Sequence, residues 1–405
     1  MQILLNALIV IAAAGLAGWL LLSRRLRESG DWKAMLTPLA SIMGSGFLVS
    51  APLLADSVGV YALPCMAALL LLSYMVGWVI RFNIAHFEPV ENKGPGAAQS
   101  AAFVSRLVLA IAYFISVTYY LQLLAAFSMK ALGLEGAQIA RAITSASLVI
   151  ICGVGIWKGL SVFERLERHT TALNLAMIGG LLLALLVHNL SLLGSGNWQL
   201  PRIDSGVGLH DIQILLGLLI IVQGFETSRY LGHLHPAEQR IRTMRDAQLL
   251  SGAIYILFIG LATVLFSEGP GADVTAIISM TKPVAAVLPV LLSIAAIGSQ
   301  FSAATADSAG AGGLVEDLSG ERLPERHAYI LILAVTLGLA WLTDVNAIIA
   351  IASRAFALYY CLQCLVALLV ASGSRQLAVR ILHLLGFAVM ALLCLAVTLF
   401  GIPAG

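Results

Sequence analysis

Three charged residues lie deep inside long apolar stretches of this sequence: Glu226, Asp307 and Arg354. The chain has 23 basic and 21 acidic residues, and the remaining charges fall between the apolar stretches or near their ends. A charge at the centre of a lipid bilayer costs at least ~2.5–3.5 kcal/mol on insertion scales, so it usually marks an ion or substrate path. Two acids and one base leave one surplus negative charge, which predicts a bound cation or proton. A purely structural ion pair is the alternative.

Arg354 is the only base that we place at this depth. It stands about ten residues into its apolar stretch, too far from either surface to reach water easily, and its planar guanidinium suits a carboxylate. We therefore expect Arg354 to pair with Glu226 or Asp307 in at least one state, with an exchange between the two acids during gating. The alternative is that Arg354 binds an anionic substrate directly.

Glycines interrupt two apolar stretches at similar depth, at residues 44–46 and at Gly224. Paired interruptions in two inverted halves of a membrane protein indicate a binding site, because freed backbone groups can face a cavity there. We expect both segments to be non-helical and to face one another near mid-membrane. Close helix packing is the alternative for each cluster.

The interrupted segments predict a site for a zwitterion. Backbone amides at residues 44–46 favour a carboxylate at a half-helix N-terminus, and the carbonyls of Gly224 and Phe225 suit an ammonium, with Phe225 as a lid. The predicted substrate-binding residues are Met43, Gly44, Ser45, Gly46, Tyr119, Gly224, Phe225, Glu226 and Arg354.

The elements that must carry these residues are membrane-spanning helices. Hydrophobic residues make up 60% of the 405 residues, charged residues only 11%, and mean hydropathy is +0.95. About a dozen stretches reach the ~20 residues that span a bilayer as helix. The predicted fold is therefore an all-α polytopic membrane protein. The spans are expected at 3–23, 35–55, 59–81, 99–128, 139–157, 171–195, 209–231, 247–267, 284–316, 327–343, 345–372 and 378–401.

Loop charges predict the orientation. Threading twelve spans puts eighteen Lys and Arg residues on one side and four on the other, so by the positive-inside rule both termini face outward from a bacterial cytoplasmic membrane. The first span carries its basic cluster after it, as a retained helix does. The lipid bilayer is thus the expected partner, and the net charge of +2 gives no reason to expect nucleic acid.

The spans divide into four expected parts. Residues 1–34 form an extra helix with a basic loop, and residues 378–405 form a final helix. Between them, 35–195 and 209–372 each hold five helices that begin with an interrupted one. Since five is an odd number, the second repeat lies inverted in the membrane.

Three short motifs resemble the amino acid–polyamine–organocation (APC) transporter superfamily. Residues 44–47 with Pro52 resemble its first helix, 224–226 through Pro236 and Arg240 its sixth, and Ser308 through Pro324 its eighth. The resemblance covers most of residues 35–372. It implies the leucine-transporter-like inverted-repeat fold and alternating access. Two departures from the family are Ala309, where a basic residue is common, and the lack of a lysine in 171–195, which argues against lysine-mediated proton coupling.

The resemblance also implies an ion site. In the related fold a sodium ion lies between first-helix carbonyls and eighth-helix hydroxyls, which match Ala40 and Met43 with Ser299 or Ser302 here. If protons are used instead, Glu226 is the best carrier. Serines that bond their own backbone are the alternative. The predicted ion-coupling residues are Ala40, Met43, Glu226, Ser299, Ser302 and Asp307, and no cofactor other than sodium is expected.

Other chemistry has weak support. The five cysteines lie in apolar spans, and His233, His235 and Glu238 make a poor metal cluster. We find no phosphate-binding glycine loop and no catalytic triad, so an enzyme or an ATP-driven pump is not expected. The sequence favours a secondary transporter for an amino acid or similar small organic solute, coupled to Na⁺ or H⁺. The alternatives are an inorganic cation transporter and a transport-inactive sensor.

Overall fold

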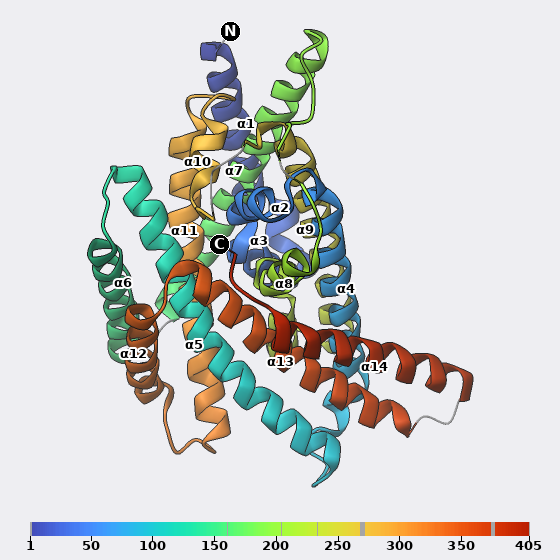
Figure 1. Ribbon diagram of the computed structural model, residues 1–405. Coiled ribbons are helices and arrows are strands. Elements are labelled where there is room, and N and C mark those ends of the chain that lie inside the picture. Colours follow the sequence, from blue (N-terminus) through green and yellow to red (C-terminus); the bar gives the residue numbers. More distant parts are fainter. Residues whose placement is uncertain are drawn as a thin grey trace.

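The computed structural model describes residues 2–159, 161–203, 205–232, 234–267, 272–373 and 377–404, and this part is all-helical, as predicted (Figure 1). Side chains are described except at residues 2–4, 45, 161–168, 325 and 377–380. The helices are α1 (Gln2–Leu22), α2 (Arg24–Glu28), α3 (Gly30–Val58), η1 (Gly59–Tyr61), α4 (Ala62–His86), η2 (Glu88–Val90), α5 (Ala97–Leu132), α6 (Ala137–Lys158), α7 (Ser161–Gly194), α8 (Leu209–Gly217), η3 (Leu219–Val222), η4 (Phe225–Leu231), α9 (Ala237–Ala262), η5 (Thr263–Leu265), α10 (Ala276–Thr281), α11 (Leu288–Leu318), α12 (Glu325–Leu342), α13 (Val345–Ser372) and α14 (Leu377–Phe400).

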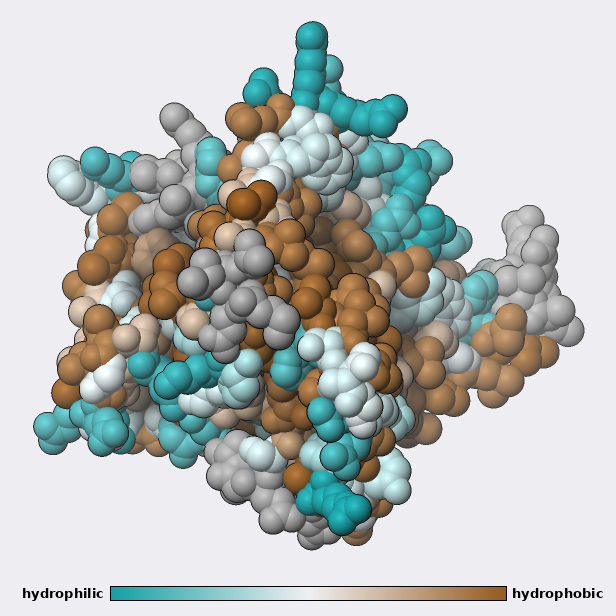
Figure 2. Space-filling model, turned by 90° about the horizontal axis from the view of Figure 1, so that it is seen from above, coloured by the Kyte–Doolittle hydropathy of each residue, from teal (hydrophilic) through white to brown (hydrophobic). Residues whose placement is uncertain are grey.

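Nine helical stretches in the described part of the chain are long and apolar enough to cross a membrane. One of them, Gly30–Val90, contains both α3 and α4. The shorter apolar helix α12 and the segmented helix α8–η3–η4 correspond to the two remaining predicted spans, at 327–343 and 209–231. Hydrophobic side chains cover much of the face shown in Figure 2, with hydrophilic ones gathered toward its margin. Such an apolar exterior is stable in lipid rather than in water.

Helix α5 lies at the centre of the bundle and packs mainly against α11 and α13, while α3 and α4 pack against α9. The extra helix α1 packs against α7. Glycines allow this approach, because a Cβ on Gly180 would lie 3.3 Å from the Cβ of Ala13. The division of the bundle into two inverted five-helix repeats remains a prediction.

The helix at residues 209–231 is broken, as predicted. Helix α8 passes into η3, the chain is extended at Gln223, and η4 begins after Gly224, whose φ is +117°. A Cβ at Gly224 would lie 2.7 Å from the backbone carbon of Ser41, so this break contacts the backbone of α3. Only glycine combines this backbone conformation with so close an approach.

The predicted break at residues 44–46 is wrong, because α3 continues as helix through them. The glycines serve close packing instead. A Cβ on Gly46 would lie 2.5 Å from the Cβ of Ile221, and the carbonyl of Gly44 accepts a hydrogen bond from the Gln300 side chain at 2.9 Å. The two glycine-bearing segments do face one another, but only the second of them is interrupted.

Candidate functional site

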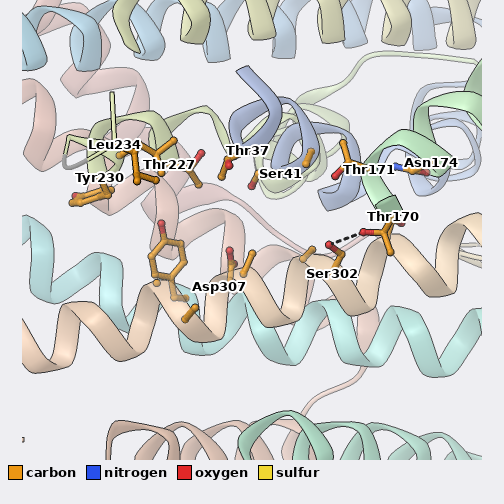
Figure 3. A pocket seen from close by; sticks show the side chains of 18 residues that line it. Thr37, Ser41, Thr170, Thr171, Asn174, Thr227, Tyr230, Leu234, Ser302 and Asp307 are labelled. Atoms are coloured by element: carbon orange, nitrogen blue, oxygen red, sulfur yellow. Dashed lines mark hydrogen bonds between the residues drawn. The ribbon is translucent and has the colours of Figure 1, made fainter. Parts of the chain in front are cut away.

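A cavity of about 460 Å³ lies between α3, α5, α7, η4 and α11 (Figure 3). Its polar lining consists of Thr37, Ser41, Tyr113, Thr170, Thr171, Asn174, Thr227, Tyr230, Ser299, Ser302 and Asp307. The remaining described lining residues are alanine, leucine and glycine. The described lining thus contains one acid and no lysine, arginine or histidine.

Asp307 is the charged group of this cavity. Its helix α11 packs closely against α5, and the hydroxyl of Ser116 on α5 donates a hydrogen bond to its carboxylate. Only 5% of Asp307 is exposed. Figure 3 shows Asp307 and Ser302 projecting from α11 toward Thr37 and Ser41 of α3. The carboxylate is therefore fixed on one wall, and its negative charge faces a chamber of hydroxyl groups and small apolar side chains.

Glu226 lies behind the cavity rather than in its lining. It belongs to the first turn of η4, is 1% exposed, and accepts hydrogen bonds from the Gly224 amide at 3.0 Å and the Tyr360 hydroxyl at 2.8 Å. Phe225 stacks on Tyr360, with ring centroids 5.4 Å apart, so it does not cover this cavity. Glu226 therefore binds the backbone amide that is freed at the break in the helix.

In the state that the structure describes, Arg354 does not make the predicted ion pair. Its side chain is exposed and its Nε donates to the carbonyl of Thr398 at 2.7 Å, not to either acid. Thr398 lies in the last turn of α14, where carbonyls lack intrahelical partners and a positive charge is stabilising. The neighbouring Ser353 is fully buried, whereas Arg354 lies on an exposed face of α13.

The buried bases are instead Arg81, Arg229 and Arg240, which sequence reasoning had placed in loops. Arg240 binds both carboxylate oxygens of Glu88, at 3.0 and 2.7 Å, and donates to the Arg229 carbonyl at 2.8 Å. Arg229 in turn donates to the side chain of Gln363. These contacts anchor the end of η4, the half of the broken helix that contributes Thr227 and Tyr230 to the cavity.

The structure brings only part of the predicted site together. Of the predicted ion-coupling residues, Ala40, Ser299, Ser302 and Asp307 line the cavity. The hydroxyl of Ser302 accepts a hydrogen bond from Thr170, while that of Ser299 donates to the backbone of its own helix. Outside the cavity lining are Met43, Gly44, Gly46, Tyr119, Gly224, Phe225 and Glu226, which are all buried, and Arg354. The side chain of Ser45 lies outside the described part.

Sequence reasoning missed most of the polar lining, above all Thr37, Tyr113, Thr171 and Thr227. Asn174 is a further polar residue of the lining, within the apolar stretch of α7. A signal was present there, because Thr170, Thr171 and Asn174 share one helix face at spacings of three and four residues. For the suggested metal cluster, His233 lies outside the described residues, and within them no three His, Cys, Asp or Glu side chains form a metal-binding group.

Comparisons with known proteins agree with this architecture. A family model described as APC superfamily transporter matches residues 24–401. A protein from Aquifex aeolicus (strain VF5), described as uncharacterized, is 38% identical over 387 residues, covering 94% of this chain and 93% of its own. Two structures of a manganese transporter from Eremococcus coleocola superpose with a TM-score of 0.56 at 12% and 13% identity, covering 91% of this chain and 87% of theirs. By its family match and its relative, the chain belongs to the APC superfamily of transporters.

Proposed function

We propose that this chain is a secondary active transporter for a small organic solute that carries a positively charged amino group, such as an amino acid or an amine. It works by alternating access in a bacterial cytoplasmic membrane, coupled to Na⁺ or H⁺, and catalyses no covalent reaction. The cavity of about 460 Å³ supports this, since its volume is typical of small-molecule sites.

The observation that carries the proposal is the charge of the cavity lining. Asp307 is buried there without an arginine or lysine among the described lining residues, and a buried carboxyl group stays ionised only beside a positive partner, otherwise taking up a proton. An ammonium group supplies one. Because α3 is unbroken, no helix amides are free at residues 44–46 to receive a carboxylate. The carboxylate of an amino acid would instead meet hydroxyls such as those of Ser41 and Thr171.

The orientation follows from the basic loops, which we assign to the cytoplasm. Thr37 stands near the start of α3, and Asp307 in the second half of α11, so both lie toward the basic side. The cavity is then in the cytoplasmic half of the membrane, as expected of an inward-facing state. Transport requires a second state in which the same residues face outward.

Two coupling ions fit the surroundings of the cavity. The carbonyl of Ala40 and the hydroxyls of Ser299 and Ser302 would give Na⁺ the oxygen ligands that hard cations prefer. A proton would instead use Glu226, which is buried beside the break in the helix. Transport that is indifferent to sodium in the parent and in Ser302→Ala alike would favour the proton.

A ligand screen on the purified protein tests the solute class. Ligands at a hundredfold excess over their dissociation constant stabilise a protein by ~2.7 kcal/mol, which raises its melting temperature. We expect amino acids or amines to raise it for the parent and not for Asp307→Asn. The matched control is Asp317→Asn on the same helix, because Asp317 is exposed and pairs with Arg106 outside the cavity.

Two outcomes would overturn this assignment. Stabilisation by anionic or uncharged solutes alone would contradict the role of Asp307. Stabilisation by divalent metal alone would favour an inorganic cation transporter, a second candidate supported by the oxygen-rich lining and by the manganese transporter that shares the fold. Binding without movement in liposomes would indicate a sensor.

A further inference from the structure

The residues that follow α14 fold back onto the outer half of the broken helix. In Figure 1 the dark red chain end runs from α14 toward α8. The amide of Ile402 donates to the carbonyl of Gln213 in α8 at 3.1 Å, and Ala404 is buried. We call residues 401–404 the strap. The backbone hydrogen bond and the burial of Gly401 and Ala404 make it a packed element of the bundle.

Two glycines make this contact backbone to backbone. A Cβ on Gly217 would lie 2.0 Å from the carbonyl oxygen of Ile402, and a Cβ on Gly401 would lie 3.3 Å from the Cα of Gly217. The clashing atoms belong to the main chain, so no side-chain rotation relieves them. An alanine at Gly217 therefore requires α8 and the strap to move apart.

Helix α13 contacts both the end of α14 and the outer half of the broken helix. Arg354 donates to the carbonyl of Thr398 at 2.7 Å, and the hydroxyl of Ser353 accepts from the amide of Ile220 in η3 at 2.9 Å. Adjacent residues of α13 thus hold the end of α14 and the outer half of the broken helix. Beyond the break at Gly224, η4 is anchored separately by Arg240. The two halves are thus held by different residues on either side of Gly224, although η4 also contacts α13 through Tyr360 and Gln363.

We propose that the strap holds the outer half of the broken helix closed over the cavity and must release it when the cavity opens to the opposite face. This inference rests on the proposed alternating access. The strap contact then stabilises the inward-facing state only. Weakening the contact therefore shifts the population toward the outward-facing state.

Cysteine labelling tests the strap without measuring transport. Ser41→Cys, in a background without other cysteines, places a reporter thiol in the cavity, and a membrane-impermeant maleimide is applied to the face opposite the basic loops. We expect Gly217→Ala to speed this labelling about tenfold by shifting the two populations. Gly338→Ala is the matched control, since a Cβ there meets no atom within 4 Å. Equal labelling in the folded Gly217→Ala and Gly338→Ala proteins would overturn the proposal.

A cross-link provides the converse test and covers the case in which Gly217→Ala does not fold. Gln213→Cys with Ile402→Cys lies at a backbone hydrogen-bonded pair, a separation suited to a disulfide. We expect the oxidised protein to bind solute but not transport it, and reduction to restore transport. Undiminished transport in the oxidised protein would overturn the proposed role of the strap. Absence of transport in the parent would instead contradict the proposed function, while the labelling result would still report on the strap.

Discussion

Asp307 and Glu226 are both buried carboxyl groups, yet their surroundings give them different tasks. Asp307 faces the cavity and accepts one hydrogen bond from Ser116. Glu226 faces the backbone, where it accepts from Gly224 and Tyr360. A carboxylate with open access is suited to bind a cation, whereas one enclosed by its own donors stabilises the local chain. For this reason we propose that Asp307 binds the solute, and that Glu226 acts only as the proton carrier if protons are the coupling ion.

Ser116→Ala tests whether the orientation of Asp307 matters for binding. A hydrogen bond to a charged group contributes ~1.5–3 kcal/mol, so its loss is expected to weaken solute affinity by about tenfold to a hundredfold. The measurement is the solute concentration that gives half-maximal stabilisation in the melting assay.

The control is Ser293→Ala on α11, because that hydroxyl donates only to the backbone of its own helix, at 2.7 Å. An equal loss of affinity in both variants would show that a general change in helix packing, not the carboxylate, is responsible.

Arg354 shows the limit of sequence reasoning at the residue scale. Hydropathy locates a residue along the membrane normal, and the depth predicted for Arg354 was reasonable. Its direction around the helix depends on which neighbours α13 packs against, and those neighbours are distant in sequence. The unpaired carbonyls at the end of α14, which Arg354 contacts, follow from the fold and not from any local motif. Asp307 does lie on a buried face of its helix, since its neighbours Ala304 and Ser308 are also buried.

At the scale of elements, the broken helix links the cavity to the rest of the bundle. Its inner half contributes Thr227 and Tyr230 to the lining, and its outer half is covered by the strap. Between them Gly224 adopts a left-handed conformation against α3. The two halves can change their relative angle only if this residue tolerates both conformations, which favours glycine.

Gly224→Ala should therefore be strongly destabilising. The new Cβ would lie within 2.8 Å of the backbone of Ser41 and Ile42, in a conformation that non-glycine residues rarely adopt. We expect a lower melting temperature and a loss of transport. Gly298→Ala on α11 is the control, because its Cβ meets no atom within 4 Å and alanine favours helix by about 1 kcal/mol. A Gly224→Ala protein as stable as the control would contradict the requirement for glycine at this break in the helix.

The glycines of α3 explain why one break was predicted correctly and the other was not. A glycine in an apolar stretch permits either a break or a close helix contact, and both uses have the same sequence pattern. Gly224 is followed by an acid that binds the freed amide, whereas Gly44 and Gly46 have no such partner nearby in sequence. Capping groups therefore give better evidence for a break than glycine alone.

For the whole molecule, the fold class was predictable because a bilayer permits few backbone arrangements. Apolar stretches of membrane length must form helices that satisfy their own hydrogen bonds, so hydropathy located nearly every element. The cavity was less predictable, since its walls come from α3, α5, α7, η4 and α11, and small polar residues in those helices have no distinctive pattern. Membrane helices tolerate serine and threonine in many positions because these hydroxyls can bond to their own backbone.

Orientation is the property of the whole molecule on which the inward-facing assignment depends. By the twelve-span threading both termini lie on one side, and the loops assigned to the opposite side carry most of the arginine and lysine. Asn197, after α7, and Arg322, before α12, are both exposed and lie on opposite sides of the bundle by this threading. The measurement uses intact cells that express the protein without its native cysteines. We expect an impermeant maleimide to label Asn197→Cys directly and Arg322→Cys only after the cells are permeabilised. The reverse labelling pattern would show that the orientation in the membrane is inverted, and the cavity with Asp307 would then lie in the outer half of the membrane.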